Sequence, residues 1–427
     1  MRYKAIPNNL FIRNRENFVN KLNKGAVALF CSNDVLPTNA DGVMGFKQNA
    51  DLFYLTGIDQ EETFLFLFPD HPVSQNREVL FIRETNAHLK VWEGEKLSKE
   101  QAKEISGIGT VLWSNQLPAF LARNLELAQC LYLDANEHDG RNRDFQSQSD
   151  RFNAQIREQY PLLPVERAAP ILSGLRTIKS PEEIEQIQKA LSISEKAFRR
   201  IASKLKPGVW EFELEAEMMH EFTINRSGGH AFPPIVASGK NACVLHYVTN
   251  NAQVQAGDLV LMDFGASYAN YNADITRCLP ANGRFSSRQK EVYQAVLNVF
   301  HFAKKLLVVG NDMQSLRNET AAKMREELIK LGLFSSEEAD SNPELYRKYF
   351  PHGVSHHLGL DVHDVGNRYE PFKNGMVFTC EPGIYIEEEG IGIRLENDIL
   401  IQDQSPVDLA ENIPIEIEDI ENLMQAN

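Results

Sequence analysis

The chain has 427 residues, a formal net charge of −15, 43% hydrophobic residues and 24% charged residues. This length predicts two or three domains, and the composition is that of an ordinary globular protein rather than of a disordered one. The acidic balance argues against a nucleic-acid-binding protein, because such proteins normally carry a basic face.

The first residues, MRYKAIPNNLFIRNREN, contain no apolar run of the length that a signal peptide needs. No other segment reaches the apolar length of a membrane span. The five cysteines are scattered and lack the CxxC spacing of metal and redox sites. Reduced thiols of this kind are typical of cytosolic proteins, so we expect a cytoplasmic protein that binds neither membranes nor nucleic acid.

Residues 1–170 are predicted to form an N-terminal α/β domain. Short apolar runs of strand length alternate with polar segments that are compatible with helices. The runs are AVALF (26–30), TFLFLF (63–68), VLFI (79–82) and LYLDA (131–135). This part of the sequence has no cluster of metal-ligating residues and no glycine pattern for binding phosphate. We therefore expect it to serve oligomerisation and to form the entrance of an active site.

Residues 171–427 are predicted to form a catalytic domain with two similar halves. SPEE (180–183) gives a helix N-cap, a proline at the first helical position and a glutamate three residues after the cap. Ser286 opens a similar helix later in the chain, and each of these helices is followed by a second one. The predicted helices cover residues 180–205, 211–225, 286–306 and 313–331. The repeat is too long for a solenoid and indicates two pseudo-symmetric halves.

Each helix pair is followed by acidic residues in apolar sequence typical of strands. GDLVLMDFG carries Asp263 and GMVFTCEPG carries Glu381, each six residues after a glycine. A second carboxylate follows in each half, Asp274 in the first and Glu396 in the second. Each of the four acids alone is more often structural, for example as a salt-bridge partner. Because buried carboxylates are costly unless they are paired, protonated or bound to metal, the repeat favours a centre for divalent cations.

Histidines accompany these acids. PHGVSHHLGLDVHD (351–364) contains four of them, and His246 lies in VLHY. The glycines predict irregular backbone and the Glu of H-E-x-x-H is missing, so a zinc-binding helix is not expected. Carboxylates with one imidazole favour Mn²⁺, with Co²⁺, Fe²⁺ or Zn²⁺ as alternatives. Two such ions about 3.5–4 Å apart can acidify a water and polarise a carbonyl, so the predicted reaction is hydrolysis.

Five motifs resemble, in the same order, those of the pita-bread metallopeptidases, which include methionine aminopeptidase, Xaa-Pro dipeptidase and Xaa-Pro aminopeptidase. The motifs are LHY, MDFGASYANYNADITR, HGVSHHLGLDVHD, TCEPGIY and GIRLEND. ADGVMGFKQNADLFYLTG (40–57) and VWEG (91–94) resemble the N-terminal domain of aminopeptidase P. The resemblance covers essentially the whole chain. It implies an α/β N-terminal domain followed by a pseudo-two-fold pita-bread catalytic domain.

The resemblance also implies the residues of the site. Two divalent ions would be held by Asp263, Asp274, His356, Glu381 and Glu396. Glu381 would also assist proton transfer, and His246 and His363 would contact the substrate and stabilise the tetrahedral intermediate. His352 would lie near a proline pocket, and Tyr385 and Arg394 would line the site, Arg394 as an orienting or proton-shuttling residue that contacts the substrate.

The implied function is that of a dinuclear-metal Xaa-Pro aminopeptidase, which releases the first residue of peptides with proline second. A homodimer or homotetramer is expected. Xaa-Pro dipeptidase is an alternative that shares the metal ligands, and a non-catalytic peptide-binding pita-bread module is another. Two positions depart from the expected pattern. His357 follows the predicted ligand His356 and could compete for metal, and Cys380 precedes Glu381 but is expected to point into the core.

Overall fold

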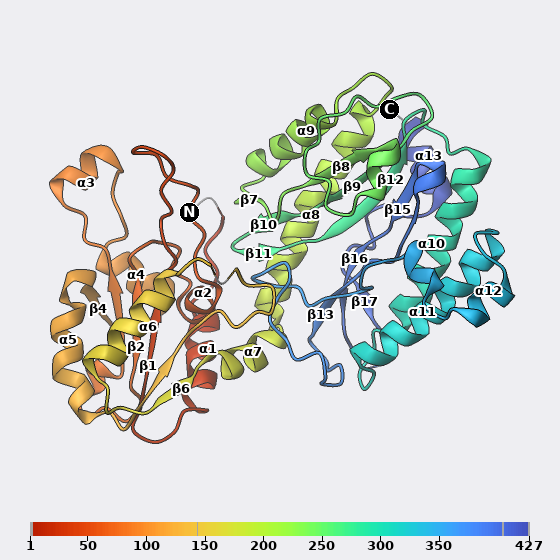
Figure 1. The fold of residues 1–427 in the computed structure, drawn as a ribbon. Coiled ribbons are helices and arrows are strands. Elements are labelled where there is room, and N and C mark those ends of the chain that lie inside the picture. The colour runs from red at the N-terminus through yellow and green to blue at the C-terminus, as the bar shows by residue number, and fades with distance from the viewer. Residues whose placement is uncertain (1–2, 143, 404, 426–427) are drawn as a thin grey trace. The chain divides into compact units, whose positions relative to one another are not determined.

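The computed structural model describes residues 3–142, 144–403 and 405–425, and the chain divides into two compact units (Figure 1). Unit 1 extends to Arg176, and unit 2 begins at Thr177. Both units mix helices and strands, so the α/β class predicted from the sequence is confirmed. Within the three described ranges, every helix is too short or too polar to cross a lipid bilayer.

Unit 1 is built on one mixed six-stranded sheet. In spatial order its strands are β4 (Thr110–Trp113), β3 (Glu78–Ile82), β2 (Phe64–Leu67), β1 (Ala26–Cys31), β5 (Cys130–Leu133) and β6 (Val165–Arg167). β1 is buried along its whole length, as its continuous apolar sequence predicts for a central strand. The four strands expected from the sequence are confirmed as β1, β2, β3 and β5. The two edge strands β4 and β6 were not predicted, because they are short and only partly buried.

Among the described residues, seven α-helices accompany this sheet: α1 (Asn9–Val19), α2 (Ala50–Thr56), α3 (Ala87–Trp92), α4 (Lys99–Ser106), α5 (Leu117–Asn124), α6 (Gln148–Gln159) and α7 (Ala169–Thr177). Apolar side chains of α5 and α6 pack on those of β1, β2, β3 and β5 to form a core rich in phenylalanine. Phe66 and Phe81 both meet Phe120 edge to face, with ring centroids 5.1 and 5.3 Å apart. This aromatic packing closes one face of the sheet.

Unit 2 contains the predicted helix pairs. They are α8 (Pro181–Lys204) with α9 (Glu211–Ile224), and α10 (Ser287–Leu306) with α11 (Met313–Lys330). The members of each pair pack side by side (Figure 1). Capping boxes at Ser180 and Ser286 begin α8 and α10, as the local sequence predicts. Two further helices are short: α12 (Ser336–Ser341) and α13 (Ile417–Gln425).

The strands of unit 2 form several small sheets. One has the order β12 (Ile275–Pro280), β9 (Leu259–Phe264), β8 (Ile235–Ser238), and another the order β13 (Val377–Cys380), β16 (Asn397–Leu400), β17 (Val407–Asp408). β14 (Gly383–Ile386) pairs with β15 (Ile391–Arg394), and β10 (Ala266–Tyr268) lies between β7 (Gly229–His230) and β11 (Tyr271–Asn272). Ala269 and Asn270 form the tight turn between β10 and β11, with positive φ values of 51° and 64°.

One contact between the two halves of unit 2 is an isolated backbone bridge between Thr276 on β12 and Glu396. The N–H of Glu396 donates to the carbonyl of Thr276 at 3.1 Å. β9 runs antiparallel to β12, which places Asp263 opposite Thr276. The strand ends that carry the predicted acidic residues are therefore brought to one place by main-chain pairing.

Candidate metal centre

The four predicted acids lie at the ends of strands from both halves of unit 2. Asp263 is on β9, Asp274 immediately precedes β12, Glu381 immediately follows β13, and Glu396 lies between β15 and β16. All four come within a small region because β9, β12 and the segment around Glu396 are paired to one another. The structure therefore brings together side chains that are more than a hundred residues apart in the sequence.

His356 completes the group. Its Nε2 lies 3.5 Å from Asp274 Oδ2 and 3.6 Å from Glu381 Oε1. One ligand atom each from Asp274, His356 and Glu396 lie within 4.8 Å of one another. Two ligand atoms bound at about 2.1 Å to one ion stand roughly 3.0–3.4 Å apart in tetrahedral or octahedral geometry. The two spacings to His356 are slightly longer than this, so these side chains fit a shared divalent ion.

The ring orientation of His356 favours metal binding through Nε2. Its Nδ1 lies 3.0 Å from the carbonyl oxygen of His357, and its backbone N–H donates to Thr379 Oγ1 at 3.2 Å. A neutral imidazole carries one N–H, and here the carbonyl fixes that proton on Nδ1. The lone pair on Nε2 is thereby directed at the carboxylates.

The acids repel one another strongly. Burial raises the pKa of Asp274 and Glu396 well above the usual range, and the neighbouring carboxylates raise it further. Burial also raises the pKa of Glu381. Oδ1 of Asp263 is buried and has no hydrogen-bond partner among the described residues. Such a group is stable when protons or cations balance it, and four carboxylates balance two divalent ions.

Arg394 is the cation built into this centre. Its Nη2 donates to Asp263 Oδ2 at 2.5 Å, its Nε donates to Thr276 Oγ1 at 3.1 Å, and its Nη1 donates to the Tyr385 hydroxyl at 2.7 Å. The nearby anions raise the pKa of Arg394 despite its burial. Burial raises the pKa of Tyr385 in turn, so its hydroxyl stays protonated. Arg394 thus fixes the orientation of Asp263.

Three further predicted residues border the acids. His352 Nε2 lies 2.8 Å from the Tyr385 hydroxyl, and its Nδ1 lies 3.8 Å from Glu381 Oε2. Burial, with the charge of Arg394, lowers the pKa of His352 to about 4, so it is neutral. The exposed His363 ring packs edge to face on His356, with centroids 4.4 Å apart. His246 is also exposed, and it lies close enough to His352 to contribute to the lowering of the His352 pKa.

The two departures from the expected pattern lie outside the acidic group. The His357 ring packs on Phe378, with centroids 4.1 Å apart, and burial lowers its pKa to about 4. It points into the core rather than toward the acids and does not compete for them. Cys380 is fully buried with its Sγ near the carbonyl of Phe300 on α10, as strand alternation predicts.

Three residues that sequence reasoning missed support the centre. The Thr276 hydroxyl donates to Glu396 Oε2 at 2.6 Å, and Asp398 Oδ2 accepts the backbone N–H of Asp274 at 3.1 Å. Both lie two residues after a predicted acid, so strand alternation was the signal that could have found them.

The third missed residue, Glu211, is fully buried at the start of α9 and holds the loop that carries His246. Its carboxylate accepts the backbone N–H and the hydroxyl of Ser238, each at 2.7 Å. It also accepts the hydroxyl of Tyr247 and the backbone N–H of Ala252, each at 2.8 Å. No local sequence pattern marks this residue, because all its donors lie more than 25 positions away.

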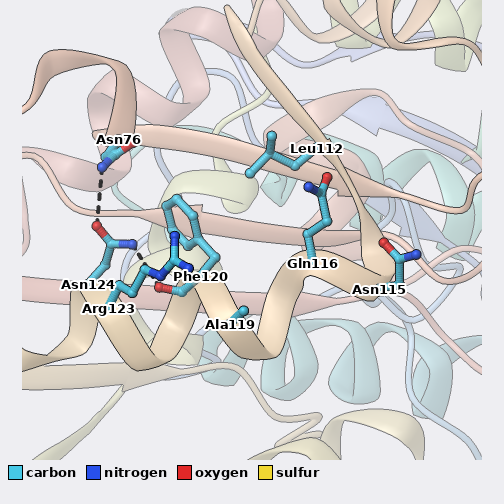
Figure 2. Close-up of a pocket in the computed structure, with 8 residues that line it drawn as sticks. All are labelled: Asn76, Leu112, Asn115, Gln116, Ala119, Phe120, Arg123 and Asn124. Carbon is cyan, nitrogen blue, oxygen red and sulfur yellow. Dashed lines mark hydrogen bonds between the residues drawn. The ribbon is translucent and has the colours of Figure 1, made fainter.

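A separate hollow lies on unit 1 and has a volume of about 760 Å³ (Figure 2). Half of its eight lining residues carry amide side chains; the eight are Asn76, Leu112, Asn115, Gln116, Ala119, Phe120, Arg123 and Asn124. Asn76 Nδ2 donates to Asn124 Oδ1 at 3.2 Å, and Asn124 Nδ2 donates to the carbonyl of Phe120 at 2.7 Å. These eight residues include no carboxylate, imidazole or thiol, so this hollow cannot supply the chemistry of the acidic centre.

Comparison with known proteins agrees with this geometry. Residues 185–403 match Metallopeptidase family M24, and residues 11–132 match the aminopeptidase P N-terminal domain. The chain is 33% identical to a Xaa-Pro aminopeptidase of Escherichia coli (strain K12) over 433 residues, which cover 97% of each chain.

Solved structures give the same result. A candidate aminopeptidase P from Bacillus anthracis superimposes with a TM-score of 0.92 at 36% identity, covering 99% of each chain. Zinc-substituted E. coli aminopeptidase P in complex with product superimposes with a TM-score of 0.91 at 32% identity, also covering 99% of each chain. The chain therefore belongs to Metallopeptidase family M24, and within it to the aminopeptidase P enzymes, which are metallo-aminopeptidases with a pita-bread catalytic domain.

Proposed function

We propose that this protein hydrolyses the first peptide bond of peptides with proline at the second position, releasing the N-terminal amino acid. The observation that carries this proposal is the convergence of His356 with Asp274 and Glu381 at 3.5 and 3.6 Å, in a chain that matches a Xaa-Pro aminopeptidase over 97% of its length. The similarity to relatives favours an aminopeptidase over a dipeptidase. The intact acidic group argues against a non-catalytic module.

We propose that two divalent ions are held by five residues: Asp263, Asp274, His356, Glu381 and Glu396. Asp274 and Glu396 each lie near other carboxylates of the group, and both would contribute oxygen ligands to the ions. When bound, the two ions supply an acidified water and an electrophile for the scissile carbonyl. The remaining chemistry belongs to residues of the chain.

Glu381 is proposed as the group that moves the proton. Burial raises the pKa of its carboxyl, which brings it closer to the range in which a carboxyl both accepts and returns a proton. The leaving group is the proline nitrogen, which has no hydrogen in the peptide and must gain one. Thr379 Oγ1 lies 3.5 Å from Glu381 Oε1 and helps to orient it. Glu381 thus both removes a proton from the attacking water and protonates the product.

The histidines are proposed to bind and orient the substrate. The rings of His246 and His363 are exposed, and we assign to them donation to the carbonyl oxygen as negative charge develops on it. His352 is held between the Tyr385 hydroxyl at 2.8 Å and the carbonyl of Gly353 at 2.7 Å, and so forms a fixed neutral wall. We assign this wall to the proline ring, whose shape a rigid apolar surface can select.

The preferred ions are proposed to be Mn²⁺, since the donor set is oxygen-rich with one imidazole. The neighbouring E. coli structure is of a zinc-substituted enzyme, which makes Zn²⁺ the first alternative. We further propose a homodimer or homotetramer that works in the cytoplasm. Its five cysteines are free thiols, which suits a reducing compartment.

A peptide series tests the proposed function. Peptides of the form Xaa-Pro-Xaa and longer should be cleaved to a free first residue, and the same peptides with alanine in place of proline should be cleaved much more slowly. An Xaa-Pro dipeptide offers no chain beyond proline and should be the poorer substrate. Preference for the dipeptide would replace the proposal with a dipeptidase, and no cleavage of either in the presence of Mn²⁺ would reject both.

A further inference from the structure

The loop between His356 and His363 carries two proposed active-site residues at its two ends. It has no helix or extended strand of its own, apart from one bridge between His357 and Phe378. Such a loop does not fix the direction of its side chains by regular hydrogen bonding. Contacts made by its interior must therefore hold the two histidines in place.

A buried ion pair fastens this loop to the start of unit 2. Lys179 Nζ lies 2.9 Å from Asp364 Oδ2, and both side chains are only 1% exposed. The backbone at Gly359, in the middle of the loop, lies close against this ion pair. A Cβ at Gly359 would lie 2.2 Å from Asp364 Oδ2 and 2.9 Å from Lys179 Nζ, so only glycine allows this approach. The loop is thus folded around the lysine side chain.

The main chain of Asp364 connects this pair to the proposed metal ligand. The backbone N–H of Asp364 donates to the carbonyl of His357 at 2.9 Å. The same carbonyl lies 3.0 Å from Nδ1 of His356 and fixes the proton there. Asp364 also directly follows His363, whose ring packs on His356. Movement of Asp364 would therefore disturb both histidines at once.

Two further contacts hold the middle of the loop and Lys179. Asn272 Nδ2 donates to the carbonyls of Gly359 and Leu360 at 3.0 and 2.9 Å, which anchors the middle of the loop. Lys179 itself is held by its backbone N–H, which donates to the carbonyl of Gly375 at 2.8 Å. The backbone of Lys179 is thus held in place, and the ion pair holds the Asp364 end of the loop against its side chain.

We propose that Lys179, acting through Asp364, is a positioning residue that sets the ring of His356 for metal binding and the ring of His363 for substrate binding. This inference rests on the proposed function. It predicts that the ion pair influences metal affinity and turnover separately from its influence on stability. A buried ion pair contributes little net stability when both partners are replaced together, whereas loss of one partner is costly.

The test compares Lys179→Met, Asp364→Asn and the combined variant, using the full chain. The free energy of unfolding should fall in each single variant and recover in the combined one. The apparent Kd for Mn²⁺, measured by titration calorimetry, should remain about ten-fold weaker in all three. Recovery of both stability and Mn²⁺ affinity in the combined variant would overturn the proposal, because the pair would then be only structural.

A second comparison isolates the effect on His363. At saturating Mn²⁺, Lys179→Gln should lower kcat/KM about ten-fold in the natural sequence but less than about two-fold when His363→Ala is also present. Additive losses would contradict the proposal. Lys179→Gln keeps a donor toward Asp364 and is the variant of choice if Lys179→Met does not fold. Lys189→Gln, which removes a surface ion pair on α8, is the control and should leave both quantities unchanged.

The calorimetric measurement does not depend on which peptide is cleaved. Failure of the peptide series with normal Mn²⁺ binding would reject the proposed function and leave the positioning role standing. Normal cleavage with unchanged Kd and kcat/KM in the Lys179 variants would reject the positioning role alone.

Discussion

Arg394 Nη2 donates to Asp263 Oδ2 at 2.5 Å, while Asp263 Oδ1 is buried with no hydrogen-bond partner among the described residues. One oxygen of this proposed ligand is therefore held by a guanidinium, and the other is left for a cation. The same guanidinium also holds Thr276 and Tyr385. Arg394 thus sets the direction of Asp263 rather than simply neutralising it.

Arg394→Lys should lower kcat/KM by about 10- to 100-fold, because an ammonium keeps the charge but cannot reach three partners at once. Tyr385→Phe removes only one of the three hydrogen bonds and should lower it less. Peptide cleavage at saturating Mn²⁺ measures both. Equal activity in Arg394→Lys and the natural protein would show that charge alone is needed.

Thr276→Val should weaken metal binding about 10- to 100-fold, because Glu396 Oε2 loses the hydroxyl that orients it at 2.6 Å. Valine has nearly the same shape, so the strand pairing of β12 with β9 should persist. Metal affinity is read by competition with a chromophoric chelator. An unchanged affinity would mean that the backbone bridge alone positions Glu396.

Glu211→Gln should lower kcat/KM about ten-fold with no change in Mn²⁺ affinity, because it disturbs the loop that carries His246 but none of the five proposed ligands. The amide would place an N–H₂ group against donors such as Tyr247, where a carboxylate oxygen now accepts. Glu217→Gln, which removes a salt bridge with Arg200 on the surface, is the matched control. Loss of metal in Glu211→Gln would contradict this separation of roles.

His357 predicts a loss of stability in acid. Its pKa is about 4 in the folded protein against 6.5 for a free histidine. Between these two pH values His357 is protonated in the unfolded chain but neutral in the folded chain. The free energy of unfolding therefore falls as the pH falls, by about 3 kcal/mol in total. Above pH 6.5 the residue is neutral in both states and contributes no slope.

His357→Leu should remove this dependence. Urea unfolding at about pH 7 and about pH 5, in the presence of a chelator, should show a smaller loss on acidification in the variant, by about 2 kcal/mol. All other residues are the same in the two proteins, so their contributions cancel in this comparison. Parallel losses in the two proteins would show that His357 does not titrate in this range.

The helices of unit 2 could be predicted from the sequence because their signals are local. The capping boxes at Ser180 and Ser286 lie within four residues of the helix starts they specify. The edge strands β4 and β6 could not be predicted, since they are short and their burial depends on neighbouring strands. A helix whose start is specified by a few neighbouring residues can therefore be predicted from the sequence, whereas an edge strand whose burial depends on distant strands cannot.

The acidic residues could be predicted because the same spacing occurs twice. Thr276 and Asp398 each follow a predicted acid by two residues, so strand alternation places them on the same face, but the partners they contact, Glu396 and Asp274, are more than a hundred residues away and are brought to them only by the fold. Glu211 was missed because its donors lie more than 25 positions away and no local pattern marks it. The residues that support a site are defined by the fold, whereas several of the residues within it can be recognised from sequence pattern.

The central claim is that five side chains from both halves of unit 2 bind two divalent ions on which hydrolysis depends. The most direct measurement is titration of Mn²⁺ into chelator-treated protein, with metal content and Xaa-Pro peptide cleavage followed together. We expect cleavage to be absent without metal and to reach its plateau at about two ions per chain, with Asp274→Asn binding fewer ions and losing activity. Full activity in protein shown to contain no metal, or unchanged binding of two ions in Asp274→Asn, would contradict the account.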